Sequence, residues 1–344
     1  MPTSPETTLM FAEAAEAPAA VARQLERLRE PIARLAAELR REPPRAVVTL
    51  ARGSSDNAAT VARYLIETHL RVLTSSAAPS VTSVYDAAPD YAGTLMLAIS
   101  QSGKSPDLIA AAEAARDGGA RLVALVNDET SPLADIADLV LPLAAGPEKS
   151  VAATKSFIAS VSALLALVAE WSGEAALGKA VAALPGLLER AWALDWSPAL
   201  PLLAEASDLY VVARGPGFGI AQEAALKIKE TCGFHAEAFS AAEVRHGPMA
   251  LVGPGFPVLL LGQDDDARES VSQLAAAFAG RGAQVIGAGI GDAPGLGLPA
   301  LAAHPAVQPL LLIQSFYRLA NALAVARGRD PDRPPHLAKV TETV

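Results

Sequence analysis

Two short serine-rich segments carry residue types that bind phosphate. The first is Gly53-Ser54-Ser55 and the second is Ser100-Gln101-Ser102-Gly103-Lys104-Ser105. Each follows an apolar run and precedes a helical pattern, and hydroxyls beside helix N-terminal amides suit a phosphate. Serines at such places also act as helix N-caps and turn residues, so a purely structural reading stays open. Because two such loops occur, the phosphate reading is favoured.

A charged stripe and a histidine-bearing segment form the second candidate. Glu223, Lys227 and Glu230 are spaced i, i+4 and i+7, which places them on one face of a helix. Such a stripe is usually a solvated surface with weak ion pairs. Here a polar segment follows directly, carries His235 and His246, and ends in Gly-Pro. That context indicates a shaped loop beside the charged helix.

Several familiar cofactor sites are excluded. His235-Ala236-Glu237 has the His-x-Glu of zinc deaminases, but that site also needs a Pro-Cys-x-x-Cys segment, and the chain has one cysteine. The glycines at 215 and 217 lack a third glycine at dinucleotide-binding spacing, and no Walker A lysine motif is present. The sequence therefore predicts no metal and no cofactor.

The elements that would position these residues alternate between strands and helices. Apolar runs at residues 46–50, 95–99 and 122–126 predict buried strands, and both serine loops follow such runs. Helical patterns cover residues 8–41, with a break expected at Pro31, and residues 58–70. This alternation predicts an α/β fold with doubly wound parallel sheets, which bind ligands at the carboxyl ends of their strands.

The pattern occurs twice. Residues 49–53 match 211–215, residues 97–101 match 259–263, residues 119–123 match 282–286, and Ser-Phe pairs at 156–157 and 315–316 each open a long helical pattern. Four matches in order predict two copies of one unit. We expect N-terminal helices at 1–45 packing on the first domain, domains at 46–193 and 194–330, and a tail at 331–344. In the second copy the equivalent loop carries Asp264 and Asp265, which would repel a phosphate, so only the first copy suits phosphate.

Composition narrows the function classes further. The 28 Lys and Arg against 37 Asp and Glu give a net charge of −9, which argues against nucleic acid as a partner. The mean hydropathy of +0.28 raises the question of a membrane. The longest apolar stretches, near 158–169 and 309–313, are too short or too interrupted to span one, and no signal peptide is visible. We expect a cytoplasmic protein that binds neither membrane nor nucleic acid.

Taken together, the motifs resemble a known family. The chain is similar to the isomerase half of glucosamine-6-phosphate synthase, which is built from two sugar isomerase (SIS) domains, and the resemblance runs from about Met10 to the C-terminus. Besides the serine loops, it rests on the stretch from Glu223 to Glu230 and on five further segments. These are Met10-x-x-Glu13-x-x-Glu16-x-Pro18, Val151-Ala152-Ala153-Thr154-Lys155, His235-Ala236-Glu237-Ala238, Arg245-His246-Gly247-Pro248 and Leu337-Ala338-Lys339.

The resemblance implies two tandem SIS domains and chemistry at C1 and C2 of a sugar 6-phosphate. In this reading Glu230 is the base, Lys227 stabilises negative charge on oxygen, and Glu223 orients Lys227. His246 would open the sugar ring in the neighbouring subunit of a homodimer, and Lys339 could form an imine with a ketose. The substrate-binding residues would be Gly53, Ser54, Ser55, Ser100, Gln101, Ser102, Ser105 and Val151.

Departures from the family pattern leave the substrate open. No glutaminase domain with its N-terminal cysteine is visible, since Pro2 follows Met1, so ammonia from glutamine is not expected. Lys104 stands where the family has an acidic residue, Ala153 where it has serine, and Arg52 is larger than usual. We therefore expect glucosamine 6-phosphate to be converted to fructose 6-phosphate and ammonia. The alternatives are a deglycase or aldose–ketose isomerase on another sugar 6-phosphate, and a non-catalytic sugar-phosphate sensor.

Overall fold

The computed structural model describes residues 4–87, 89–292 and 294–339, and these form two parallel sheets flanked by helices. The doubly wound α/β fold expected from the sequence is thereby confirmed. The chain divides into two compact units. The β1–β5 unit comprises Ala19–Glu148, Lys155–Ala182 and Ala338–Val344, and the β6–β10 unit comprises Met1–Pro18, Lys149–Thr154 and Ala183–Leu337. The domain limits at 45, 193 and 330 stay a prediction.

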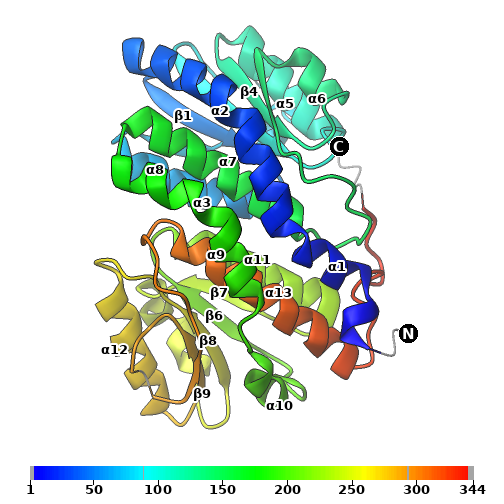
Figure 1. The fold of residues 1–344 in the computed structure, drawn as a ribbon, viewed down its shortest axis with the longest axis vertical. Helices are drawn as coiled ribbons and strands as arrows, with labels where there is room; N and C mark the ends of the chain where they lie inside the picture. Colours follow the sequence, from blue (N-terminus) through cyan, green and yellow to red (C-terminus); the bar gives the residue numbers. More distant parts are fainter. Residues whose placement is uncertain (1–3, 88, 293, 340–344) are drawn as a thin grey trace. The chain divides into compact units, whose positions relative to one another are not determined.

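The β1–β5 unit contains one five-stranded sheet (Figure 1). Its strands are β1 (Ala46–Leu50), β2 (Thr74–Ser76), β3 (Thr94–Ser100), β4 (Arg121–Val126) and β5 (Leu139–Pro142). Its helices are α3 (Ser54–His69), α4 (Pro79–Ser83), α5 (Pro106–Asp117), α6 (Pro132–Ile136), α7 (Lys155–Ser172), α8 (Ala175–Ala182) and nearly all of α2 (Ala17–Arg41). The sequence predicted β1, β3, β4 and α3 to within a few residues.

The β6–β10 unit contains the second five-stranded sheet (Figure 1). Its strands are β6 (Tyr210–Ala213), β7 (Glu237–Ser240), β8 (Pro257–Leu261), β9 (Gln284–Ala288) and β10 (Leu296–Leu298). Its helices are α1 (Leu9–Ala15), α9 (Leu184–Trp192), α10 (Leu200–Leu203), α11 (Gly217–Lys227), α12 (Arg268–Ala279) and α13 (Gln308–Ala326). The sequence predicted a helix that begins at Ser315. In the structure this helix, α13, begins earlier, at Gln308.

Both sheets have the same topology. The strand orders are β2-β1-β3-β4-β5 and β7-β6-β8-β9-β10, with every pair parallel. The order reverses direction between β1 and β3 in one sheet and between β6 and β8 in the other. Loops at such a switch point diverge, which opens a ligand crevice at the carboxyl ends of the strands. Both serine loops follow the two strands that flank this point, β1 and β3.

Side-chain alternation along the strands builds an apolar layer on both faces of each sheet. All seven residues of β3 are buried. Met96 and Ala98 pack with Leu108 and Ala112 of α5, and the intervening residues must face the other side of the sheet, since successive strand residues alternate. Strands buried on both faces read as continuous apolar runs. That is why the sequence showed them clearly.

The N-terminal helices differ from expectation. The predicted break at Pro31 is wrong, because α2 continues through this proline. Leu28, Ile32 and Leu35 are buried on either side of it, and their packing holds both halves of the helix in place. The chain instead breaks at Glu16, the C-cap of α1. Helix α1 belongs to the β6–β10 unit, where Thr8 donates to Asn321 of α13 at 2.7 Å and Phe11 meets Trp192 edge to face.

Two helices, α7 and α13, are long and apolar enough to cross a membrane by length and composition. In the most apolar segment of each helix, 83% of α7 and 78% of α13 is buried inside the structure. Helices that are apolar on all sides and covered by protein are typical of the core of a large domain. This burial accounts for the positive mean hydropathy and is compatible with a cytoplasmic location.

Candidate active site

The serine loops lie side by side at the switch point of the β1–β5 sheet. Strands β1 and β3 are paired neighbours, with Leu50 opposite Ala98. Gly53 adopts a φ of 55° and starts α3 directly, so the first loop is a tight strand-to-helix turn. In the second loop Gly103 has a φ of 63°, and a Cβ there would lie 2.1 Å from Ser131 Oγ. Only glycine fits that close approach.

The hydroxyls of these loops fall into two groups. Ser100 Oγ accepts from the Gly103 amide at 3.0 Å, and Ser102 Oγ accepts from the Lys104 amide at 3.4 Å, as the structural reading expected. Ser105, however, stands at the N-cap of α5 and makes no side-chain capping bond. The remaining positions, Gly53, Ser54, Ser55 and Gln101, lie at the same edge of the sheet and are at least partly exposed. The structure thus brings together all the predicted phosphate-loop residues except Val151.

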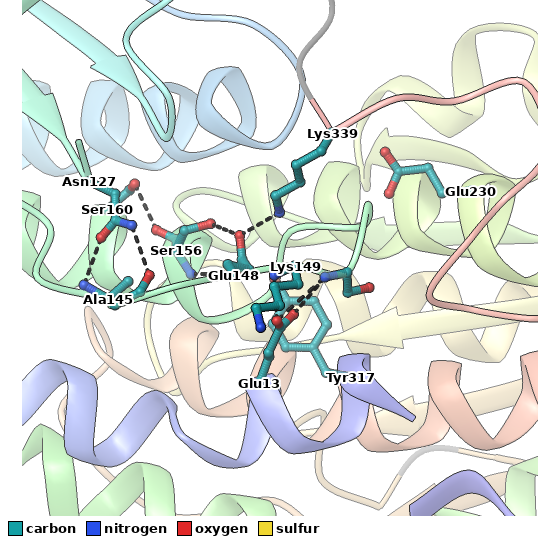
Figure 2. A network of polar contacts seen from close by, with 12 residues as sticks. Glu13, Asn127, Ala145, Glu148, Lys149, Ser156, Ser160, Glu230, Tyr317 and Lys339 are labelled. Carbon is teal, nitrogen blue, oxygen red and sulfur yellow. Dashed lines mark hydrogen bonds and ion pairs between the residues drawn. The ribbon is translucent and has the colours of Figure 1, made fainter. Parts of the chain in front are cut away.

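Val151 belongs to the β6–β10 unit. Its amide donates to the Asp332 carbonyl at 3.2 Å. The segment before it is held by Glu13, whose buried carboxylate accepts from the amides of Lys149 at 2.5 Å and Ser150 at 3.1 Å (Figure 2). Glu13 is therefore the residue of α1 that shapes the turn leading to Val151.

The charged stripe forms a buried network in the β6–β10 unit. Lys227 Nζ lies 3.4 Å from Glu223 Oε1 and 2.5 Å from Glu230 Oε2. The side chains of Glu223 and Lys227 are fully buried, whereas that of Glu230 is 20% exposed. The solvated-surface reading of this stripe is wrong, because other elements cover the helix face that carries it. Glu230 alone of the three offers a carboxylate to a ligand.

The electrostatics of the network keep Lys227 charged. Burial alone would lower the pKa of Lys227, but the two adjacent carboxylates outweigh it and raise this pKa above the ordinary value. An ammonium held in a low-dielectric site stabilises negative charge on a nearby oxygen more strongly than one in water does. The arrangement therefore offers a proton acceptor next to a fixed cation.

Two features that the sequence analysis missed position this network. Tyr317 of α13 is buried, and its hydroxyl donates to Glu223 Oε1 at 3.2 Å. In addition α11 passes into a π-helical turn, Ile228–Cys232, which carries Glu230, and such turns occur often at functional sites. The turn ends at Gly233, whose φ is 66°, and Arg327 donates to the Cys232 carbonyl at 3.1 Å. The sequence held no signal for the tyrosine contact, since Tyr317 sits in an ordinary apolar helix.

The histidine-bearing segment belongs to the same unit as the network. His246 ends a short 3₁₀ helix, Glu243–His246, and is exposed. Within the part of the chain that the structure describes, no hydrogen bond or ion pair joins His246 to Glu230. His235 is also exposed and lies 4.0 Å from Glu237. Over the same described residues, no group of three or more His, Cys, Asp or Glu side chains could hold a metal ion.

The tail lysine has a specific partner in the β1–β5 unit. Lys339 Nζ lies 3.0 Å from Glu148 Oε2, and the Glu148 side chain is fully buried (Figure 2). Ser156, in the first turn of α7, donates to Glu148 with its hydroxyl at 2.6 Å and with its amide at 3.1 Å. A helix N-terminus favours a carboxylate, so Glu148 is a fixed anion. The sequence analysis identified Lys339 but not Glu148.

Comparisons with known proteins decide the family. The SIS domain family model matches residues 42–170 and 202–294, which is more than half of the chain. The chain belongs to the SIS-domain family. Each matched segment contains most of one of the two sheets, so the predicted pair of SIS domains is confirmed.

Relatives of this SIS-domain protein include several aminotransferases. Glutamine–fructose-6-phosphate aminotransferases (isomerizing) from Zymomonas mobilis and Aeropyrum pernix are 35% and 36% identical to it, over 85% and 83% of the chain. The chain spans about half the length of these curated relatives. The matches show kinship with part of those proteins.

Solved structures match nearly the whole chain. A protein of Silicibacter pomeroyi, provisionally described as a phosphosugar isomerase, is 42% identical, with a TM-score of 0.90 over 94% of this chain and all of that one. The C-terminal domain of glucosamine-fructose-6-phosphate aminotransferase from Francisella tularensis has a TM-score of 0.86 at 24% identity, covering 95% of this chain and 98% of that one. The second likeness shows the fold alone.

Within the SIS fold, the predicted residues occupy two units. The serine loops, Glu148 and Lys339 belong to the β1–β5 unit, and Val151, the carboxylate–lysine network and His246 belong to the β6–β10 unit. The two units present different chemistry: the first offers hydroxyls suited to an anion, and the second offers a base beside a buried cation.

Proposed function

We propose that this SIS-domain protein is a phosphosugar isomerase and deaminase that converts glucosamine 6-phosphate to fructose 6-phosphate and ammonia. The ring opens to the C1 aldehyde, and the C2 proton moves to C1, which turns the C2 amine into an imine. Water then adds to the imine, giving the C2 ketone and ammonia. The atoms balance with water as the only co-reactant.

The observation that carries the proposal is the buried carboxylate–lysine network. Moving a proton between adjacent carbons needs one positioned base, and Glu230 is the partly exposed carboxylate of the network. Charge that develops on O1 of the enolamine needs a cation, and Lys227 is fully buried and held charged by its neighbours. Glu223 and Tyr317 hold Lys227 in place and touch no substrate in this scheme.

The partner of Lys339 favours deamination over enzyme–imine chemistry. An amine must be free and neutral to attack a carbonyl, and Lys339 is ion-paired with a buried carboxylate. A deaminase does not need this attack, because its substrate already carries the nitrogen. A glucosamine-6-phosphate deaminase from Thermotoga maritima has the same fold, with a TM-score of 0.77 over 98% of this chain, at 23% identity.

The same network would also serve an aldose–ketose isomerase, because proton transfer between C1 and C2 does not depend on the C2 substituent. A deglycase acting on a substituted amine would use it too. A sensor without catalysis would need no buried base and cation. Their retention in this chain supports an enzyme.

One assay distinguishes these functions. We expect the protein, incubated with glucosamine 6-phosphate, to release ammonia and fructose 6-phosphate in equal amounts, with glucose 6-phosphate unchanged. Interconversion of glucose 6-phosphate and fructose 6-phosphate without ammonia release would establish the isomerase instead. If the protein binds sugar phosphate but converts neither glucosamine 6-phosphate nor glucose 6-phosphate, the result would favour the non-catalytic sensor.

We further propose that the enzyme acts in the cytoplasm as a homodimer in which His246 opens the sugar ring in the partner's site. Its exposure supports this role, since a residue that serves a neighbouring subunit must lie at the surface of its own.

A further inference from the structure

Arg52 is a cation at the edge of the serine loops. It follows β1 and directly precedes Gly53, so its backbone belongs to the first loop. Its side chain crosses to the first turn of α5, where Nε and Nη2 donate to Asp107 Oδ2 at 3.0 and 2.6 Å. One ion pair therefore joins the first serine loop to the helix that follows the second.

The guanidinium retains unused donors. An arginine has five N–H donors, and the contact with Asp107 takes one from each of two nitrogens. The structure, within its described residues, gives Arg52 no other side-chain hydrogen bond, and 49% of the side chain is exposed. Asp107, by contrast, is fully buried, and its second oxygen accepts from the Leu108 amide at 2.9 Å. The carboxylate is fixed while one edge of the cation stays open.

The local charges explain why a cation is needed there. The first turns of α3 and α5 carry Asp56 and Asp107, and a phosphate at these helix ends would be repelled by both. Burial raises the pKa of Asp56, and the charge of Arg52 acts in the opposite direction. Arg52 thus offsets the charge of two acidic groups that would otherwise make the serine loops unsuitable for a dianion.

We propose that the Arg52 guanidinium is part of the substrate site, binding the phosphate of the sugar with its open edge while Asp107 holds it in position. The inference rests on the proposed function, because it takes the serine loops to bind the phosphate. It adds that the hydroxyls and helix ends are insufficient by themselves. A guanidinium suits this task better than an ammonium, since its planar fork can bind the aspartate and the phosphate at once.

The second sheet provides a matched control. Arg214 follows β6 and precedes Gly215, in the position that corresponds to Arg52, and is likewise exposed. The neighbouring loop there carries Asp264 in the position that corresponds to Ser102, and Asp265 follows it. Arg214→Ala should therefore leave sugar-phosphate binding unchanged.

The test is calorimetric titration with glucosamine 6-phosphate, inorganic phosphate and unphosphorylated glucosamine. Arg52→Ala should weaken binding of both phosphates about 10- to 100-fold, as expected for a charged hydrogen bond. Arg52→Lys should lose less, and Asp107→Asn should fall between Arg52→Ala and the wild type. In turnover, KM should rise while kcat stays near the wild-type value, a split that a merely structural role would not give.

The outcomes separate this inference from the function on which it rests. If the wild type binds sugar phosphate and Arg52→Ala binds it equally well, the role of Arg52 is wrong and the proposed function stands. If the wild type binds no sugar phosphate, both fail. If Arg52→Ala does not fold, the comparison is made with Arg52→Lys, which keeps the charge and the aliphatic stem and should still bind phosphate more weakly than the wild type. An equal loss in Arg214→Ala would also overturn the inference.

Discussion

The environment of Lys227 is the strongest indication of function at the residue scale. Its ammonium is completely buried with carboxylates at 3.4 and 2.5 Å. Burying an ion pair adds little net stability, because desolvation offsets the attraction, and apolar residues of similar size would serve the fold as well. Buried, strongly coupled groups of this kind are concentrated at functional sites. The network is therefore better explained by chemistry than by folding.

Glu230→Gln should lose about 10²- to 10⁴-fold in turnover, the contribution of a positioned base. Binding of sugar phosphate should persist, because the serine loops are unchanged. Steady-state kinetics and calorimetry check both parts. Glu237→Gln is the control, since Glu237 is a half-exposed carboxylate of the same unit and, among the residues that the structure describes, pairs with His235 at 4.0 Å and not with Lys227. A turnover near the wild-type value in Glu230→Gln would remove Glu230 from the mechanism.

Lys339→Ala should slow turnover less than Glu230→Gln, because the substrate of a deaminase already carries the nitrogen. For the same reason borohydride should not trap Lys339 during turnover of glucosamine 6-phosphate, as judged by the mass of the C-terminal peptide. Lys179→Ala, at an exposed lysine on α8, is the control. A trapped adduct at residue 339 would show that the lysine acts covalently and would favour the deglycase.

The pKa of Lys227 predicts a pH dependence of stability. Because this pKa is raised in the folded state, the contribution of the network is fully present below the ordinary lysine value of 10.5 and is lost only as the pH rises through the higher folded value. The difference in unfolding free energy between the wild type and Glu223→Gln/Lys227→Met should thus be constant from about pH 7 to 9.5 and change above about pH 10.5. Urea unfolding measures it, and a change between pH 7 and 9 would contradict the assignment.

At the scale of elements, the loops after equivalent strands differ although the sheets do not. Both sheets have one strand order, and β1 and β3 correspond to β6 and β8. After β3 the chain carries hydroxyls, and after β8 it carries Asp264, whose carboxylate pairs with Arg268 at 2.6 Å. The fold thus provides two switch points, and the loop residues suit only one of them to an anion.

Ser102→Asp should abolish sugar-phosphate binding, because a carboxylate placed in the loop repels the phosphate. The fold should survive, since Ser102 is partly exposed. Calorimetric binding and thermal unfolding provide the two readouts. Ser102→Asn, which has the same size without the charge, is the matched control and should retain much more affinity. Binding that survives in Ser102→Asp would mean that the phosphate site has been assigned to the wrong unit.

At the scale of the whole molecule, the homodimer proposed above assigns His246 to the site of a second subunit. His246 is exposed at the end of a 3₁₀ helix whose next residue, Gly247, has a φ of 134°. An imidazole can both donate and accept a proton, and ring opening requires such a group. Under this proposal a monomer would lack the histidine at its own site.

Mixing Glu230→Gln with His246→Ala should restore part of the activity, because a hybrid dimer would contain one site with both groups intact. Each variant alone should stay nearly inactive. Subunit exchange is verified by native mass spectrometry of differently tagged chains. If exchange occurs and no activity returns, both residues act in one subunit's site.

Much of the fold could be predicted from the sequence, because local patterns carry it. Strands buried on both faces, such as β3, are continuous apolar runs, and a tight turn into a helix leaves Gly53 and the serines after it. These signals lie within a few residues of one another. The spacing of Glu223, Lys227 and Glu230 also placed them on one helix face.

Only the tertiary structure decided what that face meets. A stripe at i, i+4 and i+7 has the same spacing whether water or protein covers it, and its burial depends on α13, which brings Tyr317 to Glu223 across 94 residues of sequence. Glu148 and Lys339 are 191 residues apart, and Arg52 and Asp107 are 55 apart. Contacts of this kind leave no local periodicity, because their geometry is set by the packing of whole elements. The sequence therefore determined which groups could react, and the tertiary structure decided which are buried, charged and paired.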